Sequence, residues 1–139
     1  MRALVQRVSR ASVSVGGEEL AAIGPGLLVL LGVTHTDTGA VADKLADKLR
    51  ALRIFPDADG KMNVPLGERG VLCISQFTLY GDARKGNRPS YVAAAPPEVA
   101  EPLYERLRVR LGAQGGVFGS MMAVELVNDG PVTLLLEMP

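Results

Sequence analysis

The run LLVLLGV at residues 27–33 restricts the fold most strongly, because it is apolar without alternation. A strand with one face in water alternates apolar and polar side chains, whereas a strand buried on both faces is apolar throughout. Pro25-Gly26 precedes the run and marks a turn. The sequence therefore predicts a central strand whose sheet is covered by other elements.

Two amphipathic helices are expected as this cover. From about Ala40 to Leu52, apolar side chains recur every three or four positions and charged residues occupy the other face. Residues 36–38 (TDT) offer N-cap oxygens for this helix. A second helix is expected from Pro96-Pro97 to a stop at Gly112, because proline suits the first helical turn and glycine the residue after the last.

Strands account for the rest of the expected fold. Residues 3–15 alternate with period two, and further strands are expected at 20–23, 53–55 and 71–80. The last two strands, 117–127 and 131–138, would form a closing pair around Asp129-Gly130, the strongest short hairpin signal, although Pro131 is an awkward first residue for a strand. The order predicts an α/β (α+β) fold with a mixed, largely antiparallel sheet or partial barrel covered by two helices.

Length and composition indicate one domain, residues 1–139, with no strong overall charge. Fifteen basic and fifteen acidic residues cancel, so contact with nucleic acid would need a local patch. The single cysteine, Cys73, excludes an internal disulfide and favours a reducing cytoplasm. The sequence contains neither a secretory h-region nor a run near the ~20 apolar residues that a membrane helix needs. No metal-ligand spacing is present, and we expect no cofactor.

Few side chains offer catalytic chemistry. His35, the only histidine, favours a surface role beside a helix cap, and Cys73 favours the core. PDADG at 56–60 favours a turn over a calcium loop. In SQFTLY (75–80), polar residues follow an apolar strand, which is equally consistent with an ordinary strand and with an edge that presents backbone N–H groups to a ligand. RKGNRPS (84–90) favours a solvated loop over an RNA contact.

Eight segments occur together in an order and spacing that resemble the D-aminoacyl-tRNA deacylase family. They are MRALVQRV, IGPGLLVLLGV, LRIFPDADGKMN, SQFTLYGD, RKGNRPSY, AAAPPE, VFGSMM and VNDGPVT. The resemblance covers nearly the whole chain, and both family motifs, SQFTL and NxGPVT, are intact. The chain departs from the family at RLGAQGGVFGSMM, which is shorter than usual and has Ser120-Met121 where Ala-Asp is frequent.

The resemblance implies the family's fold and a homodimer that hydrolyses the ester of D-aminoacyl-tRNA, or of glycyl-tRNA mischarged on tRNA-Ala. It implies that the Gly130-Pro131 bond is cis and enters the partner's active site as a chirality filter. Main-chain carbonyls close to Cα would exclude L-esters by clash. Because the ester is already activated, oriented donors and the substrate's 2′-hydroxyl would supply most of the chemistry.

The same resemblance assigns residues to roles. Gln76, Phe77 and Thr78 would form the catalytic group, with Thr78 as a positioning or water-orienting hydroxyl. Arg7 would brace the partner's Gly-Pro loop, and Asn128 would support the filter. The residues implied in binding the terminal adenosine or the acceptor stem are Ser75, Phe118, Gly119, Met121 or Met122, Lys85 and Arg88.

Two other functions remain open at this stage. A dimeric module that binds aminoacyl-tRNA without hydrolysing it would share the fold, but intact motifs argue against lost activity. A relative that removes L-alanine from mischarged tRNA would need changes that relax the filter, and neither motif shows them.

Overall fold

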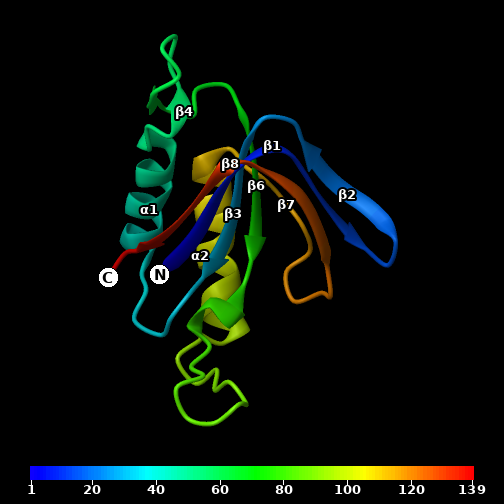
Figure 1. The fold of residues 1–139 in the computed structure, drawn as a ribbon. Helices are drawn as coiled ribbons and strands as arrows, with labels where there is room; N and C mark the ends of the chain where they lie inside the picture. The colour runs from blue at the N-terminus through cyan, green and yellow to red at the C-terminus, as the bar shows by residue number, and fades with distance from the viewer.

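A computed structural model describes residues 1–139 and shows a six-stranded mixed sheet with two helices packed against it, and a separate two-stranded sheet, β4-β5 (Figure 1). The sheet order is β2-β1-β3-β6-β7, and β8 also pairs with β1. The elements are β1 (Arg2–Val15), β2 (Glu18–Ile23), β3 (Gly26–Gly32), α1 (Gly39–Ala51), β4 (Phe55–Pro56), β5 (Met62–Val64), β6 (Gly70–Ser75), the 3-10 turn η1 (Phe77–Tyr80), α2 (Pro97–Leu111), β7 (Gln114–Gly115) and β8 (Ala123–Glu137). This arrangement confirms the predicted fold class.

The apolar run 27–33 becomes β3, the central strand. It pairs antiparallel with β1 and parallel with β6. Leu27, Val29 and Leu31 point into the main core of 22 buried residues, which lies between the sheet and the helices. Leu28 points into a second core of seven buried residues on the other face. Both faces of β3 are therefore covered, as its lack of alternation predicts.

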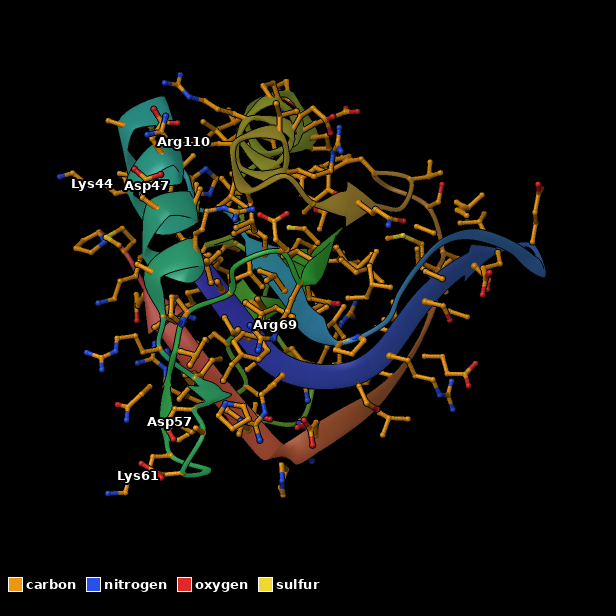
Figure 2. All side chains as sticks on the ribbon, turned by 90° about the horizontal axis from the view of Figure 1, so that it is seen from above. Lys44, Asp47, Asp57, Lys61, Arg69 and Arg110 are labelled. Carbon is orange, nitrogen blue, oxygen red and sulfur yellow. The ribbon has the colours of Figure 1, made fainter.

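Both helices form where the sequence places them. The Thr38 hydroxyl accepts the Val41 N–H at 3.4 Å and caps α1. Helix α2 begins at Pro97 and ends before Gly112, whose φ of +72° is the left-handed conformation that glycine adopts at little cost. Figure 2 shows Asp47 of α1 beside Arg110 of α2, an ion pair with 2.9 Å between Nε and Oδ1. Neither helix is long and apolar enough to cross a membrane.

Two strand predictions were wrong. The strand expected at 71–80 ends at Ser75, because the Gln76 N–H donates to Leu31 O at 2.7 Å and the chain then turns into η1. Residues 76–80 therefore do not continue the strand. The turn packs against Gly32, where a Cβ would lie 3.0 Å from Leu79 Cβ.

The closing hairpin does not form either. Residues 123–137 are one strand, β8, which pairs antiparallel with β1 on both sides of residues 129–132. Gln6 pairs with Thr133 and Val8 with Asn128, so four residues, 129–132, stand opposite Arg7. We call residues 129–132 the Gly-Pro bulge. The hairpin signal is local, and the long-range pairing with β1 overrides it.

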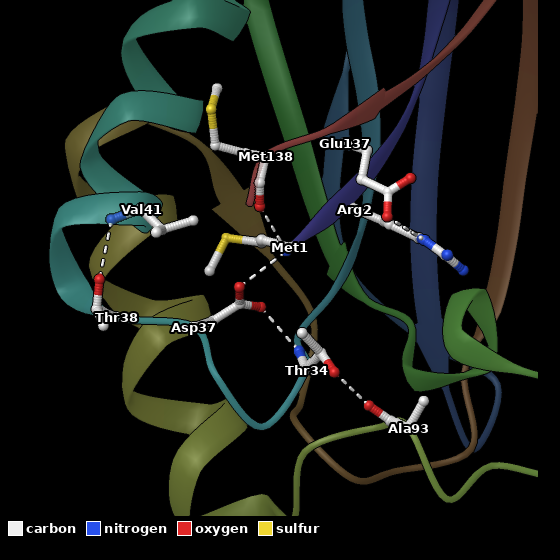
Figure 3. Close-up of polar contacts among 9 residues, drawn as sticks. All are labelled: Met1, Arg2, Thr34, Asp37, Thr38, Val41, Ala93, Glu137 and Met138. Carbon is white, nitrogen blue, oxygen red and sulfur yellow. Dashed lines mark hydrogen bonds and ion pairs between the residues drawn. The ribbon is translucent and has the colours of Figure 1, made fainter.

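The first residue of the chain is part of the packed structure (Figure 3). The Met1 side chain is buried, and the Met1 amino group lies 2.8 Å from Asp37 Oδ1 and 2.8 Å from Met138 O. Asp37 precedes α1, so this contact joins the start of β1 to the helix entrance. The β4–β5 hairpin, which carries Asp57 and Lys61, lies at the other end of α1 from the two chain termini (Figure 1).

Candidate functional site

A cavity of about 740 Å³ opens where the parallel strands β3 and β6 end. Ligands of α/β sheets bind outside the carboxyl ends of parallel strands. Eight of the residues predicted for the site line this cavity together: Ser75, Gln76, Phe77, Thr78, Phe118, Gly119, Met121 and Met122. Residues 75–78 and 118–122, which lie far apart in the sequence, therefore meet at one cavity.

The SQFTL turn, Ser75–Leu79, presents polar groups to the cavity. The N–H groups of Phe77 and Thr78 precede the first bond of the turn, which runs from Leu79 N–H to Gln76 O at 3.2 Å, so they have no partner within it. The Gln76 side-chain amide donates to the Thr78 hydroxyl oxygen. Because that oxygen accepts from Gln76, the Thr78 O–H is left to donate into the cavity.

A second wall of the cavity contains Tyr91, which the sequence analysis missed. The Phe77 and Tyr91 rings meet edge to face with 5.1 Å between centroids, and both side chains are exposed, at 55% and 40%. Tyr91 packs over Gly81, where a Cβ would lie 2.9 Å from its ring. An aromatic residue directly after the basic loop was the available signal, since exposed rings beside cations are typical of nucleotide binding.

The third wall, residues 118–122, is supported from helix α2. The Tyr104 hydroxyl donates to Cys73 O at 2.7 Å, and its ring lies 6.1 Å from that of Phe118. Burial raises the pKa of Tyr104, so the phenol stays protonated as this donor. Met122 packs against the second core, whereas Met121 is 91% exposed at the rim. Of the two methionines, Met122 is therefore the one that is packed into the cavity wall.

His35 and Cys73 take no part in the cavity lining. Burial raises the pKa of Cys73 to about 12, so the thiol is not ionised at neutral pH. The thiol lies in the main core, as predicted. His35 is exposed and its Nε2 lies 2.7 Å from Val92 O. The structure thus confirms the core role of Cys73 and the surface role of His35.

The second motif lies apart from the cavity. Gly130 and Pro131 are exposed, and the peptide bond between them is cis, as the resemblance implied. Asn128 shapes the bulge, because its Oδ1 accepts the Val132 N–H at 2.9 Å and its Nδ2 donates to Thr133 Oγ1 at 2.8 Å. None of these residues lines the cavity of the same chain.

Arg7 holds the Gly-Pro bulge of its own chain. Its Nε donates to Asp129 O at 3.0 Å and its Nη1 to Ile54 O at 2.7 Å. The resemblance had assigned Arg7 to the partner's loop, and the observed contacts lie within one chain. Gly130 has φ +134°, and a Cβ on it would lie 3.0 Å from Arg7 Nη2. Glycine at this position therefore lets the guanidinium approach the backbone.

Lys85 and Arg88 lie in the exposed loop that joins η1 to Tyr91, and neither forms an ion pair within the chain. Arg84 differs, because it binds Asp82 with 2.7 Å between Nη2 and Oδ2. That contact lowers the pKa of Asp82 to about 2. The free positive charge of the loop therefore comes from Lys85 and Arg88.

Comparison with known proteins identifies the family. The family described as "D-Tyr-tRNA(Tyr) deacylase" matches residues 4–137. The chain belongs to this family. A D-aminoacyl-tRNA deacylase of Anaeromyxobacter dehalogenans is 60% identical, with 99% of this chain and 97% of the relative aligned. One of Symbiobacterium thermophilum is 57% identical over 99% of this chain and 95% of the relative.

Solved structures agree with this deacylase family fold. A structure described as "c-Myc DNA Unwinding Element Binding Protein" is 44% identical, with a TM-score of 0.91 over 100% of this chain and 99% of that one. A probable eukaryotic D-amino acid tRNA deacylase is 18% identical, with a TM-score of 0.81 over 97% of both chains, and is similar in fold. The alignment with the Symbiobacterium relative spans 144 positions, more than the 139 residues of this chain, so that relative carries additional residues within the matched region.

Proposed function

We propose that the protein hydrolyses the ester bond of D-aminoacyl-tRNA and releases the D-amino acid and tRNA. The observation that carries this proposal is the meeting of the SQFTL turn with Phe118, Gly119 and Met122 around one cavity. Its volume of about 740 Å³ falls in the range of small-molecule sites and accommodates a nucleoside with an attached amino acid. Family membership supports the same substrate class.

The proposed chemistry depends on oriented donors. The free N–H groups of Phe77 and Thr78 stabilise the oxyanion that develops as water attacks the ester carbonyl. The Thr78 O–H, oriented by Gln76, donates to the substrate or to the attacking water. The 2′-hydroxyl of the terminal ribose assists, so the site needs no histidine or carboxylate of its own. Thr78 acts as a positioning group and not as a nucleophile, because no base contacts it.

The tRNA binds through the rings and cations around the cavity. Ser75, Phe118, Gly119 and Met122 enclose the terminal adenosine, with Met121 at the rim. Lys85 and Arg88 meet phosphates of the acceptor stem, since both are exposed and without an acidic partner. The protein would carry out this reaction in the cytoplasm as one domain, residues 1–139.

The working enzyme is a homodimer in which each cavity receives the partner's Gly-Pro bulge. The bulge is exposed and braced by Arg7 and Asn128, yet it lies outside the cavity of its own chain. Its carbonyls lie close to the substrate Cα and clash with the side chain of an L-ester. L-esters are therefore excluded, while D-esters and glycyl-tRNA-Ala are accepted. Discrimination between D- and L-esters therefore does not require binding of the amino-acid side chain.

Hydrolysis of D-tyrosyl-tRNA beside L-tyrosyl-tRNA by the purified protein tests this function. Loss of the D-ester alone is the expected result. Loss of both esters would contradict the chirality filter. Stable binding of both tRNAs without turnover would support the second candidate, a dimeric module that holds aminoacyl-tRNA without hydrolysing it.

A further inference from the structure

The wall that carries Tyr91 belongs to no helix or long strand, yet it is tied at three points. Ala95 N–H donates to Val33 O at 2.9 Å, the Thr34 hydroxyl donates to Ala93 O at 2.5 Å, and His35 Nε2 lies 2.7 Å from Val92 O. We call residues 91–95 the Tyr91 wall. All three ties come from residues 33–35, which directly follow the central strand β3.

Thr34 is itself held by a buried carboxylate (Figure 3). Asp37 Oδ2 accepts the Thr34 N–H at 2.8 Å, and Asp37 Oδ1 lies 2.8 Å from the Met1 amino group. The Asp37 side chain is only 2% exposed. Asp37 N–H also donates to Thr34 O at 3.1 Å. The Thr34 backbone is therefore held by Asp37, while the Thr34 hydroxyl binds the Tyr91 wall.

We propose that Thr34 is a positioning residue for the active site. Its hydroxyl fixes the Tyr91 wall relative to Phe77 and so sets the affinity of the cavity for the terminal nucleoside of the substrate. This inference rests on the proposed function, and it concerns a residue that neither family motif contains. Thr34 does not line the cavity and acts only through residues 92–95.

The effect falls on binding because of where the wall lies. Tyr91, Ala94 and Ala95 line the cavity, whereas the reacting donors belong to the SQFTL turn, which has its own anchor at Leu31 O. A displaced wall weakens contacts made equally in the ground state and the transition state. Loss of such contacts raises KM and leaves kcat almost unchanged.

The contact is also separate from the stability of helix α1. Thr38, four residues later, caps α1 through Val41 N–H, and its hydroxyl makes no hydrogen bond to the Tyr91 wall. Substitution of Thr38 destabilises the helix entrance without freeing Ala93. Thr38→Val is thus a matched control for Thr34→Val, because each replaces one threonine hydroxyl by a methyl group within the same segment.

The test is steady-state hydrolysis of D-tyrosyl-tRNA by the full chain and its Thr34→Val, Thr34→Ser and Thr38→Val variants. Thr34→Val is expected to raise KM by about fivefold with little change in kcat, a factor within the range of one hydrogen bond. Thr34→Ser retains the hydroxyl and should restore KM. Thr38→Val should lower the melting temperature without raising KM.

Amide hydrogen exchange supplies a readout that does not depend on activity. Thr34→Val is expected to speed exchange at Ala95, whose N–H bonds Val33 O, and to leave the α1 amides unchanged. His35→Ala provides a second test in case Thr34→Val does not fold. His35 is exposed, and its loss removes the contact with Val92 O, so this variant should also raise KM. An increase in KM for Thr38→Val equal to that for Thr34→Val would overturn the inference.

The two proposals fail in different ways. An active wild type whose KM is unchanged by Thr34→Val and His35→Ala refutes the positioning role and leaves the deacylase function intact. A wild type that hydrolyses no D-ester refutes the deacylase function and this role together, even if exchange at Ala95 increases.

Discussion

The SQFTL turn and the Gly-Pro bulge are held in opposite ways. The turn follows a buried strand, bonds directly to β3 and lines a cavity within its own chain. The bulge interrupts the pairing of an edge strand, points outward and is held by side chains, those of Arg7 and Asn128. One chain therefore brings the SQFTL turn and residues 118–122 together around one cavity, while its second motif stays outside that cavity.

Subunit mixing tests most directly whether the SQFTL turn and the Gly-Pro bulge of one site come from different chains. In the proposed homodimer, Gln76→Ala and Gly130→Ala should each lack normal D-specific turnover. After subunit exchange, half of the dimers are mixed and each contains one intact composite site, so about a quarter of wild-type activity is expected. Activity that stays at the level of the separate variants would show that both motifs act within one chain.

Gln76→Ala should have the next largest effect, on kcat. Loss of the amide leaves the Thr78 hydroxyl without its orienting donor. We expect kcat for D-tyrosyl-tRNA to fall by about 10²-fold, as for removal of one oriented donor, with the D-to-L ratio unchanged. Gln6→Ala on β1 is the control, because Gln6 does not line the cavity. Its Nε2 lies 3.5 Å from Thr133 Oγ1. A selective rise in L-ester hydrolysis would place the filter at the turn.

Arg7→Ala should alter selectivity more than rate. The Arg7 side chain is 12% exposed and bonds two carbonyls, so its loss frees the bulge. We expect the D-to-L ratio of kcat/KM to fall by roughly tenfold and the free energy of unfolding to fall by about 1–3 kcal/mol. Arg10→Ala removes an exposed ion pair with Glu125 and should change neither quantity. An equal loss of D- and L-turnover would assign Arg7 to folding alone.

Charge changes in the basic loop should have smaller effects. The double variant Lys85→Gln, Arg88→Gln is expected to reduce the slope of log K against log salt for tRNA binding by about 1–2, with a moderate loss of affinity. Arg84→Gln is the control, because Arg84 is occupied by Asp82. The same change of slope in Arg84→Gln would contradict a specific role for the two unpaired cations.

The smallest expected effect is at Asp82. Arg84 lowers its pKa to about 2 from 3.8, so the pair contributes to stability above pH 3.8 and is lost as the pH falls through about 2. The pair is exposed, and the pH dependence of unfolding between these values should be slight. Arg84→Gln should return the pKa towards 3.8 in an NMR titration of the Asp82 carboxyl, with hydrolysis at neutral pH unaffected.

The sequence predicted the elements that local signals determine, but not those that long-range contacts determine. Both helices were predictable, since their period and their caps at Thr38 and Gly112 lie within the segments themselves. The end of β6 was not, because the chain turns at Gln76 only through Leu31 O and the space over Gly32. β8 likewise looked like a hairpin, since nothing in residues 126–137 reveals their pairing with β1.

The candidate site shows the same division. The family resemblance pointed to the SQFTL turn and to residues 118–122, and the structure brings these two segments together around the cavity. Tyr91 was overlooked because a single aromatic after a basic loop has little meaning until Phe77 is seen 5.1 Å away. Thr34 has no sequence signal at all, since its partner Ala93 offers only a backbone carbonyl. Contacts to main-chain atoms leave almost no trace in residue identity.

Strand β1 acts as a fixed spacer between the two motifs. Arg2 donates to Leu79 O of the SQFTL turn at 2.9 Å, and Arg7 donates to Asp129 O of the bulge. Four residues lie between the two arginines, so the arginines point to opposite faces of the strand. One inserted residue would bring both to the same face and leave one motif without its guanidinium. The two contacts therefore fix the length of β1 between Arg2 and Arg7, whichever side chains occupy positions 3–6.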